Sequence, residues 1–147
     1  MKRFWKPGYS VTLSLVVTYL AGAVLLALMF TAPSVLRGIF NMDFFVNKVI
    51  VIFYACCPAG CAAIVSLLML LHNIRGGKVF TRRNVKLLRL ISWCFVFVAL
   101  VSVYATYIYY PCALILAAAG FLAVILRVVK NVMEQATHMK EEQELTI

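Results

Sequence analysis

Three long stretches without a charged residue dominate the chain, and short basic segments separate them. They cover residues 7–36, 49–74 and 90–126, which are 30, 26 and 37 residues long. One helical crossing of a bilayer needs about 20 apolar residues. The first two stretches therefore predict one membrane-spanning helix each, over about residues 11–32 and 48–74, with an amphipathic connector over residues 33–48.

The third stretch decides the number of crossings. A single helix of that length would rise about 55 Å at 1.5 Å per residue, whereas the hydrocarbon core is about 30 Å thick. Tyr109-Tyr110-Pro111-Cys112 supplies a turn near its middle, with tyrosines suited to a membrane interface. We therefore expect two helices, over about residues 82–109 and 112–138, on either side of this turn.

A basic hinge, residues 76–89, joins the two halves of the chain. Gly76 is expected to take the left-handed conformation that ends a helix. Thr81 is expected to cap the next helix, with its hydroxyl accepting from the backbone N–H of Asn84. Cations in a first helical turn oppose the helix dipole, so we expect a membrane surface to favour them.

Composition places the protein in a membrane. Of its 147 residues, 65% are hydrophobic and only 13% are charged, about half the roughly 25% of soluble proteins. The net charge of +9 would also suit a nucleic-acid binder. The basic residues flank the apolar stretches and form no face of their own, so we expect no direct contact with nucleic acid.

The positive charge also predicts the orientation. With four crossings, 12 of the 14 basic residues fall on one side, leaving only Arg37 and Lys48 on the other. This bias favours a bacterial cytoplasmic membrane protein with both termini inside. A cleaved signal peptide is the alternative for the start of the chain, and the length of the first apolar stretch disfavours it.

The predicted fold is all-α: a single domain, residues 1–147, that forms an integral membrane four-helix bundle, N-in and C-in. Beyond Arg127, apolar residues recur at helical spacing, which predicts a cytoplasmic helical extension. A flexible acidic tail is expected over residues 139–147. Small residues at 21–23 and 117–120 permit close helix contacts, either within the monomer or between copies in a homo-oligomer.

The cysteines are the main candidates for chemistry. Cys56, Cys57 and Cys61 lie in the second predicted helix, and Cys112 lies at the turn. The usual redox pair is Cys-x-x-Cys, a spacing absent here, and no His or carboxylate lies nearby to complete a metal site. Packing is the favoured interpretation, and a membrane thiol-disulfide oxidoreductase is the alternative.

The three uncharged stretches hold no Asp, Glu, Lys or Arg, and His72 lies where the second helix leaves the membrane. This disfavours intramembrane catalysis and leaves a small transporter component as a weaker alternative. We expect no enzyme activity, no catalytic residue, no metal and no cofactor. The basic hinge is instead the candidate contact surface, for anionic lipid headgroups or a cytoplasmic protein partner. Its candidate residues are Phe80, Thr81, Arg82, Arg83, Asn84, Lys86 and Arg89.

Two motifs carry a resemblance. Residues 77–81 read Gly-Lys-Val-Phe-Thr, and residues 84–91 read Asn-Val-Lys-Leu-Leu-Arg-Leu-Ile. This hinge resembles the signature of a bacterial four-helix membrane family, domain of unknown function 2975, which includes the YoaS-like proteins. The ending Glu141-Glu142-Gln143-Glu144-Leu145-Thr146-Ile147 is similar to the family's ending, with Glu144 where Asp is usual.

The resemblance implies four helices, a bacterial cytoplasmic membrane and no known activity. Members of the family often lie beside small helix-turn-helix regulators, which implies such a regulator as a partner. We therefore expect an uncharacterised multi-pass membrane protein with a regulatory or accessory role, whose hinge docks a cytoplasmic partner.

Overall fold

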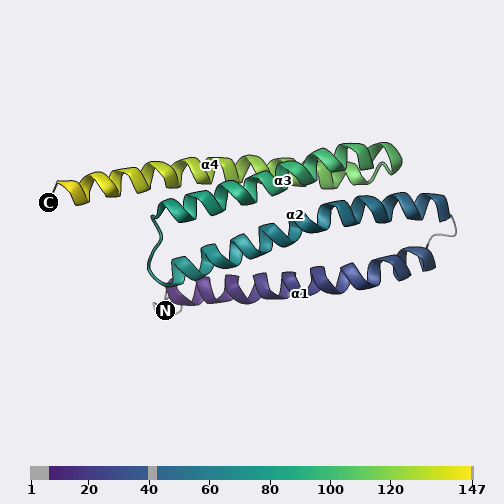
Figure 1. Cartoon of the computed structure of the whole chain (residues 1–147), viewed down its shortest axis with the longest axis horizontal. Helices are drawn as coiled ribbons and strands as arrows, with labels where there is room; N and C mark the ends of the chain where they lie inside the picture. Colours follow the sequence, from purple (N-terminus) through teal and green to yellow (C-terminus); the bar gives the residue numbers. More distant parts are fainter. Residues whose placement is uncertain (1–6, 40–42, 147) are drawn as a thin grey trace, which may run out of the picture.

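A computed structural model shows four antiparallel helices and describes residues 7–39 and 43–146 (Figure 1). The helices are α1 (Pro7–Ile39), α2 (Asp43–Arg75), α3 (Arg82–Ile108) and α4 (Cys112–Leu145). No strand occurs within these described ranges. The all-α, four-helix prediction is therefore confirmed.

Each helix packs against its neighbour in sequence, α1 on α2, α2 on α3 and α3 on α4 (Figure 1). No other pair of helices packs closely in the part of the chain that the structure describes. The start of α1, the loop 76–81 and the end of α4 lie at one end of the molecule, which we call the hinge end. The turn between α3 and α4 lies at the opposite end, which we call the turn end.

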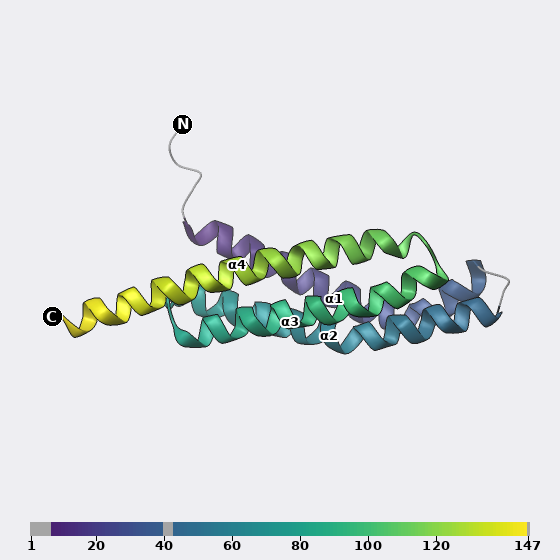
Figure 2. The same cartoon turned by 90° about the horizontal axis from the view of Figure 1, so that it is seen from above.

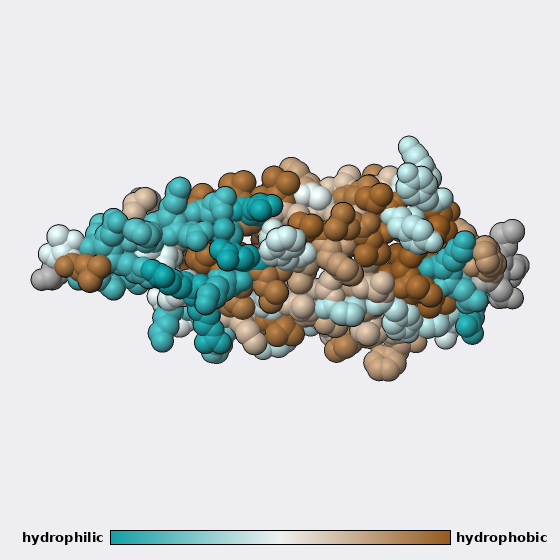
Figure 3. All heavy atoms as spheres, turned by 45° about the horizontal axis from the view of Figure 1, so that its top comes forward, coloured by the Kyte–Doolittle hydropathy of each residue, from teal (hydrophilic) through white to brown (hydrophobic). Residues whose placement is uncertain are grey.

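The surface is that of a membrane protein. Each helix is long and apolar enough to cross a bilayer, by its length and composition. Large apolar side chains such as Phe30, Leu114 and Phe121 are exposed along the helices. Figure 3 shows this apolar surface in the middle of the molecule, with hydrophilic residues concentrated at the hinge end. The protein is therefore a multi-pass membrane protein.

The first two helices are longer than predicted. α1 continues through Pro33 to Ile39 and α2 begins at Asp43, so most of the predicted connector is helical. Residues 40–42 of that connector lie outside the described residues. The predicted connector began at Pro33, which lacks an N–H for the carbonyl four residues earlier, that of Met29. The Tyr54 hydroxyl of α2 donates to this carbonyl at 2.7 Å and replaces the missing partner.

The fourth helix also extends beyond its predicted end near residue 138, to Leu145. Its last turns reach past the start of α3 (Figure 2). Within these turns, His138 lies 3.2 Å from Glu142, one helical turn later, and Glu141 contacts α3. The acidic segment is therefore helical through residue 145 and packed beside the basic hinge.

Candidate functional site

The end of α2 is closed by a Schellman motif. The N–H of Gly77 donates to the carbonyl of Ile74 at 3.0 Å, and the N–H of Lys78 donates to that of Asn73 at 3.1 Å. Gly77 has a φ of +76°, the left-handed conformation that this motif requires. The prediction that Gly76 takes this conformation is wrong, because Gly76 still bonds to His72 in the helical pattern.

Thr81 is the N-cap of α3, as predicted, but the cap is made differently. Thr81 has the extended backbone of an N-cap residue, and its hydroxyl makes no capping hydrogen bond. Its backbone carbonyl accepts instead from the N–H groups of Asn84, at 3.0 Å, and Val85, at 3.3 Å. The predicted hydroxyl cap is therefore wrong, although the boundary is right.

Asn84 is the buried centre of the hinge. Its side chain is fully buried, and its Nδ2 donates to the carbonyls of Lys78 and Val79, both at 2.8 Å. Its Oδ1 accepts from Nδ2 of Asn73, also at 2.8 Å. One side chain thus joins the end of α2, the loop and the first turn of α3. Asn84 positions the site and cannot itself touch a partner, which corrects its prediction as a contact residue.

The other predicted contact residues reach the surface of the hinge end. Phe80 is 41% exposed, Thr81 is half-buried, and the four basic side chains of α3 are exposed. These basic residues are Arg82, Arg83, Lys86 and Arg89. The first turns of α3 therefore present an exposed set of basic side chains, which we call the basic face, and the preceding loop presents an exposed aromatic ring.

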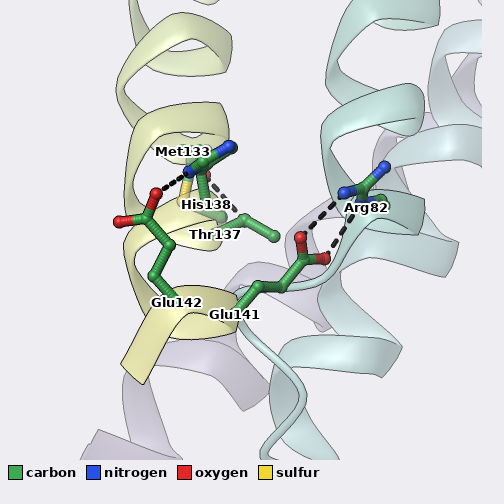
Figure 4. A network of polar contacts seen from close by, with 6 residues as sticks. All are labelled: Arg82, Met133, Thr137, His138, Glu141 and Glu142. Carbon is green, nitrogen blue, oxygen red and sulfur yellow. Dashed lines mark hydrogen bonds and ion pairs between the residues drawn. The ribbon is translucent and has the colours of Figure 1, made fainter. Parts of the chain in front are cut away.

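A groove of about 250 Å³ runs between this basic face and the last turns of α4. We call it the mixed-charge groove; its lining includes Arg82, Lys86, Arg89, Glu134, His138 and Glu141. Glu141 accepts two hydrogen bonds from Arg82, at 2.9 Å from Nε and 2.8 Å from Nη2 (Figure 4). These bonds hold the pKa of the Glu141 carboxyl below its usual range.

A second carboxylate lies further along the groove. Glu134 lies 3.0 Å from Nζ of Lys130, one turn earlier on α4, and 3.9 Å from Nη2 of Arg89 on α3. The hydrogen bond from Lys130 is the main reason why the pKa of Glu134 is lowered. Arg83 and Lys86, by contrast, form no ion pair with any residue that the structure describes.

Sequence reasoning missed the α4 side of this site. Glu134, His138 and Glu141 line the groove. The first two lie in the predicted fourth helix but were not named as candidates, and Glu141 lies in the segment that was expected to be a flexible tail. The His138–Glu142 spacing of four residues was a signal that the helix continues past residue 138, since such pairs meet on one helix face. Nothing in the sequence signals the Arg82–Glu141 pair, whose partners lie 59 positions apart.

The cysteines do not form a comparable site in the described residues. Cys56, Cys57 and Cys61 lie on α2, Cys94 lies on α3 and Cys112 begins α4. All five are free, and Cys57 is buried. The described ranges hold no group of three His, Cys, Asp or Glu residues that could bind a metal ion. The redox interpretation stays a hypothesis.

The fold and the site together define a four-helix, multi-pass membrane protein with a basic hinge and an acidic helical end packed against it. A family model described as "Protein of unknown function (DUF2975)" matches residues 14–147. The chain belongs to this family, which confirms the resemblance seen in the hinge and the ending. No curated protein and no solved structure matches the chain.

Proposed function

We propose that this protein is a regulatory or accessory component of the bacterial cytoplasmic membrane whose basic hinge docks an acidic cytoplasmic protein. The observation that supports this most directly is the two-bond pairing of Arg82 with Glu141. The chain's own carboxylate already occupies part of the basic face, in the geometry that an acidic partner would use.

The rest of the basic face has the chemistry of a contact surface. Arg83 and Lys86 are exposed and have no carboxylate partner among the described residues. Phe80, in the loop that leads into α3, adds an exposed aromatic ring at the same end of the molecule. Arginine and aromatic residues are enriched in protein interfaces and carry much of their binding energy. An acidic segment with one apolar anchor residue fits this face.

The end of α4 would then compete with the partner. Both side chains of the Arg82–Glu141 pair are substantially exposed, and exposed ion pairs contribute little net free energy because water and salt screen them. A partner carboxylate can therefore replace Glu141 at small cost. The family resemblance suggests a helix-turn-helix regulator as this partner.

Site-specific photocrosslinking in cells tests the proposal. A photoreactive residue at Lys86 should form an adduct with one defined soluble protein, and the same residue at Tyr110, at the turn end, should not. Truncation after Met139 should increase the adduct because it removes Glu141. Arg83→Glu should abolish the adduct. Docking at the hinge would be contradicted if the same adducts formed from positions 86 and 110. It would also be contradicted if Arg83→Glu left the adduct from position 86 unchanged.

A further inference from the structure

A second groove between α3 and α4 lies on the membrane side of Arg89. It has a volume of about 430 Å³, and we call it the basic groove. It is lined by Arg89, Ser92, Trp93 and Val96 of α3 and by Arg127 and Lys130 of α4. Of the candidate residues chosen from sequence, only Arg89 belongs to it.

The basic groove sits where charge gives way to the apolar surface. Arg89 and Arg127 are the two residues that bound the uncharged stretch 90–126. The Ser92 hydroxyl donates to the carbonyl of Ala123 at 3.2 Å, which sets the register of α3 against α4 and places both arginines at one level. Trp93 is 63% exposed at the groove. Tryptophan with adjacent arginines is typical of the boundary between headgroups and hydrocarbon.

The charges of the basic groove are only partly neutralised. Lys130 pairs with Glu134 at 3.0 Å, and Arg89 is 3.9 Å from the same carboxylate. Arg127 forms no ion pair with the residues that the structure describes. The groove thus has three cations and only one adjacent carboxylate, which leaves it positively charged close to the low-dielectric core of a membrane.

We infer that the basic groove binds the phosphate of an anionic phospholipid in the leaflet at the hinge end. Two arginine forks and a lysine suit a phosphate, and the Arg127 guanidinium is available for it. Val96 is one turn deeper than Trp93 and continues the groove toward exposed Phe97 and Leu100, along which acyl chains would lie. A water-soluble acidic peptide would leave this apolar continuation uncovered.

The inference does not depend on partner docking. Arg127 lies outside the surface proposed to dock a protein. Its replacement therefore tests lipid binding without changing that surface. The test reads Trp93 fluorescence in a Trp5→Phe protein, because these are the only two tryptophans. The full chain is reconstituted in vesicles of dibrominated phosphatidylcholine, which quenches Trp93. Unbrominated phosphatidylglycerol, or unbrominated phosphatidylcholine in a parallel titration, then replaces it stepwise. The recovery of Trp93 fluorescence reports which lipid occupies the groove.

We expect phosphatidylglycerol to be preferred over phosphatidylcholine about fivefold or more, as attraction to each cation near the surface suggests. Arg127→Gln should reduce the preference about fivefold, toward equal binding. The matched control Arg83→Gln, at an exposed arginine outside the groove, should leave it unchanged. Lys130→Gln provides a second variant if Arg127→Gln does not reconstitute.

Three results would overturn the inference. Equal recovery with phosphatidylglycerol and phosphatidylcholine would show that the groove has no preference for an anionic lipid. An unchanged preference in both Arg127→Gln and Lys130→Gln would place the lipid elsewhere. Loss of the preference when inorganic phosphate is added at constant ionic strength would show a site for free phosphate instead.

Discussion

The hydroxyl of Tyr54 on α2 donates a 2.7 Å hydrogen bond to the backbone carbonyl of Met29 on α1. That carbonyl has no helical partner because Pro33, four residues later, lacks an N–H. No water is present in the hydrocarbon core to satisfy it, and an unpaired carbonyl there is costly. Tyr54 therefore lets α1 continue through its proline and ties it to α2.

Tyr54→Phe should lower the stability of the protein by about 1 kcal/mol, a typical loss for a hydrogen bond between membrane helices. Thermal unfolding in detergent, followed by a thiol-reactive dye on the cysteines, measures this. Tyr19→Phe is the matched control, since the structure gives this exposed tyrosine of α1 no hydrogen bond.

Replacing Pro33 tests whether the Tyr54 hydroxyl matters because of the missing proline N–H. Pro33→Ala restores the N–H that Met29 lacks, so Tyr54→Phe should cost much less in that background. An equal cost with and without Pro33 would mean that the hydroxyl does not serve the freed carbonyl.

Asn84→Ala should destabilise the protein by about 1–3 kcal/mol, because it removes three part-buried hydrogen bonds, to the carbonyls of Lys78 and Val79 and from the Asn73 amide. Unfolding in detergent, compared with Asn131→Ala at an exposed position of α4, gives the difference. If the two variants unfold alike, Asn84 does not hold the hinge together.

The two hinge glycines should respond differently to alanine. Gly77→Ala should cost about 1–2 kcal/mol, because a Cβ is strained at positive φ. Gly76→Ala should be tolerated, since the added Cβ would lie at an ordinary contact distance of 3.5 Å from the carbonyl oxygen of Asn73. Melting temperatures of both variants decide this, and a larger loss at position 76 would argue against the Schellman motif.

Sequence reasoning went furthest where local signals were sufficient. The uncharged stretches gave the number and order of the helices, and α3 and α4 begin at Arg82 and Cys112, as expected. The predictions failed where a contact with a residue distant in sequence changes the local backbone or the exposure of a side chain. The predicted helix end before Pro33 did not take into account the hydrogen bond from Tyr54, a residue of the next helix. No local sequence pattern shows that Asn84 is buried.

The candidate site shows the same division. The basic face of α3 could be predicted because it is one helix with a recognisable start. The specific pairing of Arg82 with Glu141 could not, because the two residues meet only once α3 and α4 are packed in register. Arg127 likewise becomes part of a groove only through its position opposite Arg89.

The contact between α4 and the hinge should depend on pH. The pKa of Glu141 is lowered by Arg82, so the contact contributes stability above the usual glutamate pKa of about 4.3. That contribution is lost as the pH falls through the lowered pKa. Hydrogen exchange of residues 139–145 should be faster in Arg82→Gln than in the parent protein at pH 7.

At acidic pH, where Glu141 is protonated, the parent and Arg82→Gln should exchange alike once intrinsic rates are corrected. Arg83→Gln, which removes an unpaired cation, should match the parent at both pH values. Equal exchange of Arg82→Gln and the parent at pH 7 would show that the ion pair does not hold the end of α4.

The central claim is that the hinge end faces the cytoplasm. Single cysteines replace Lys78, in the loop 76–81, or Tyr110, at the turn end, in a variant without the native cysteines. A membrane-impermeant maleimide is then added to intact cells. We predict that Tyr110→Cys is labelled at once and that Lys78→Cys is labelled only after the cells are opened. Labelling of Lys78→Cys in intact cells would contradict the orientation, and with it the proposed docking of a cytoplasmic partner.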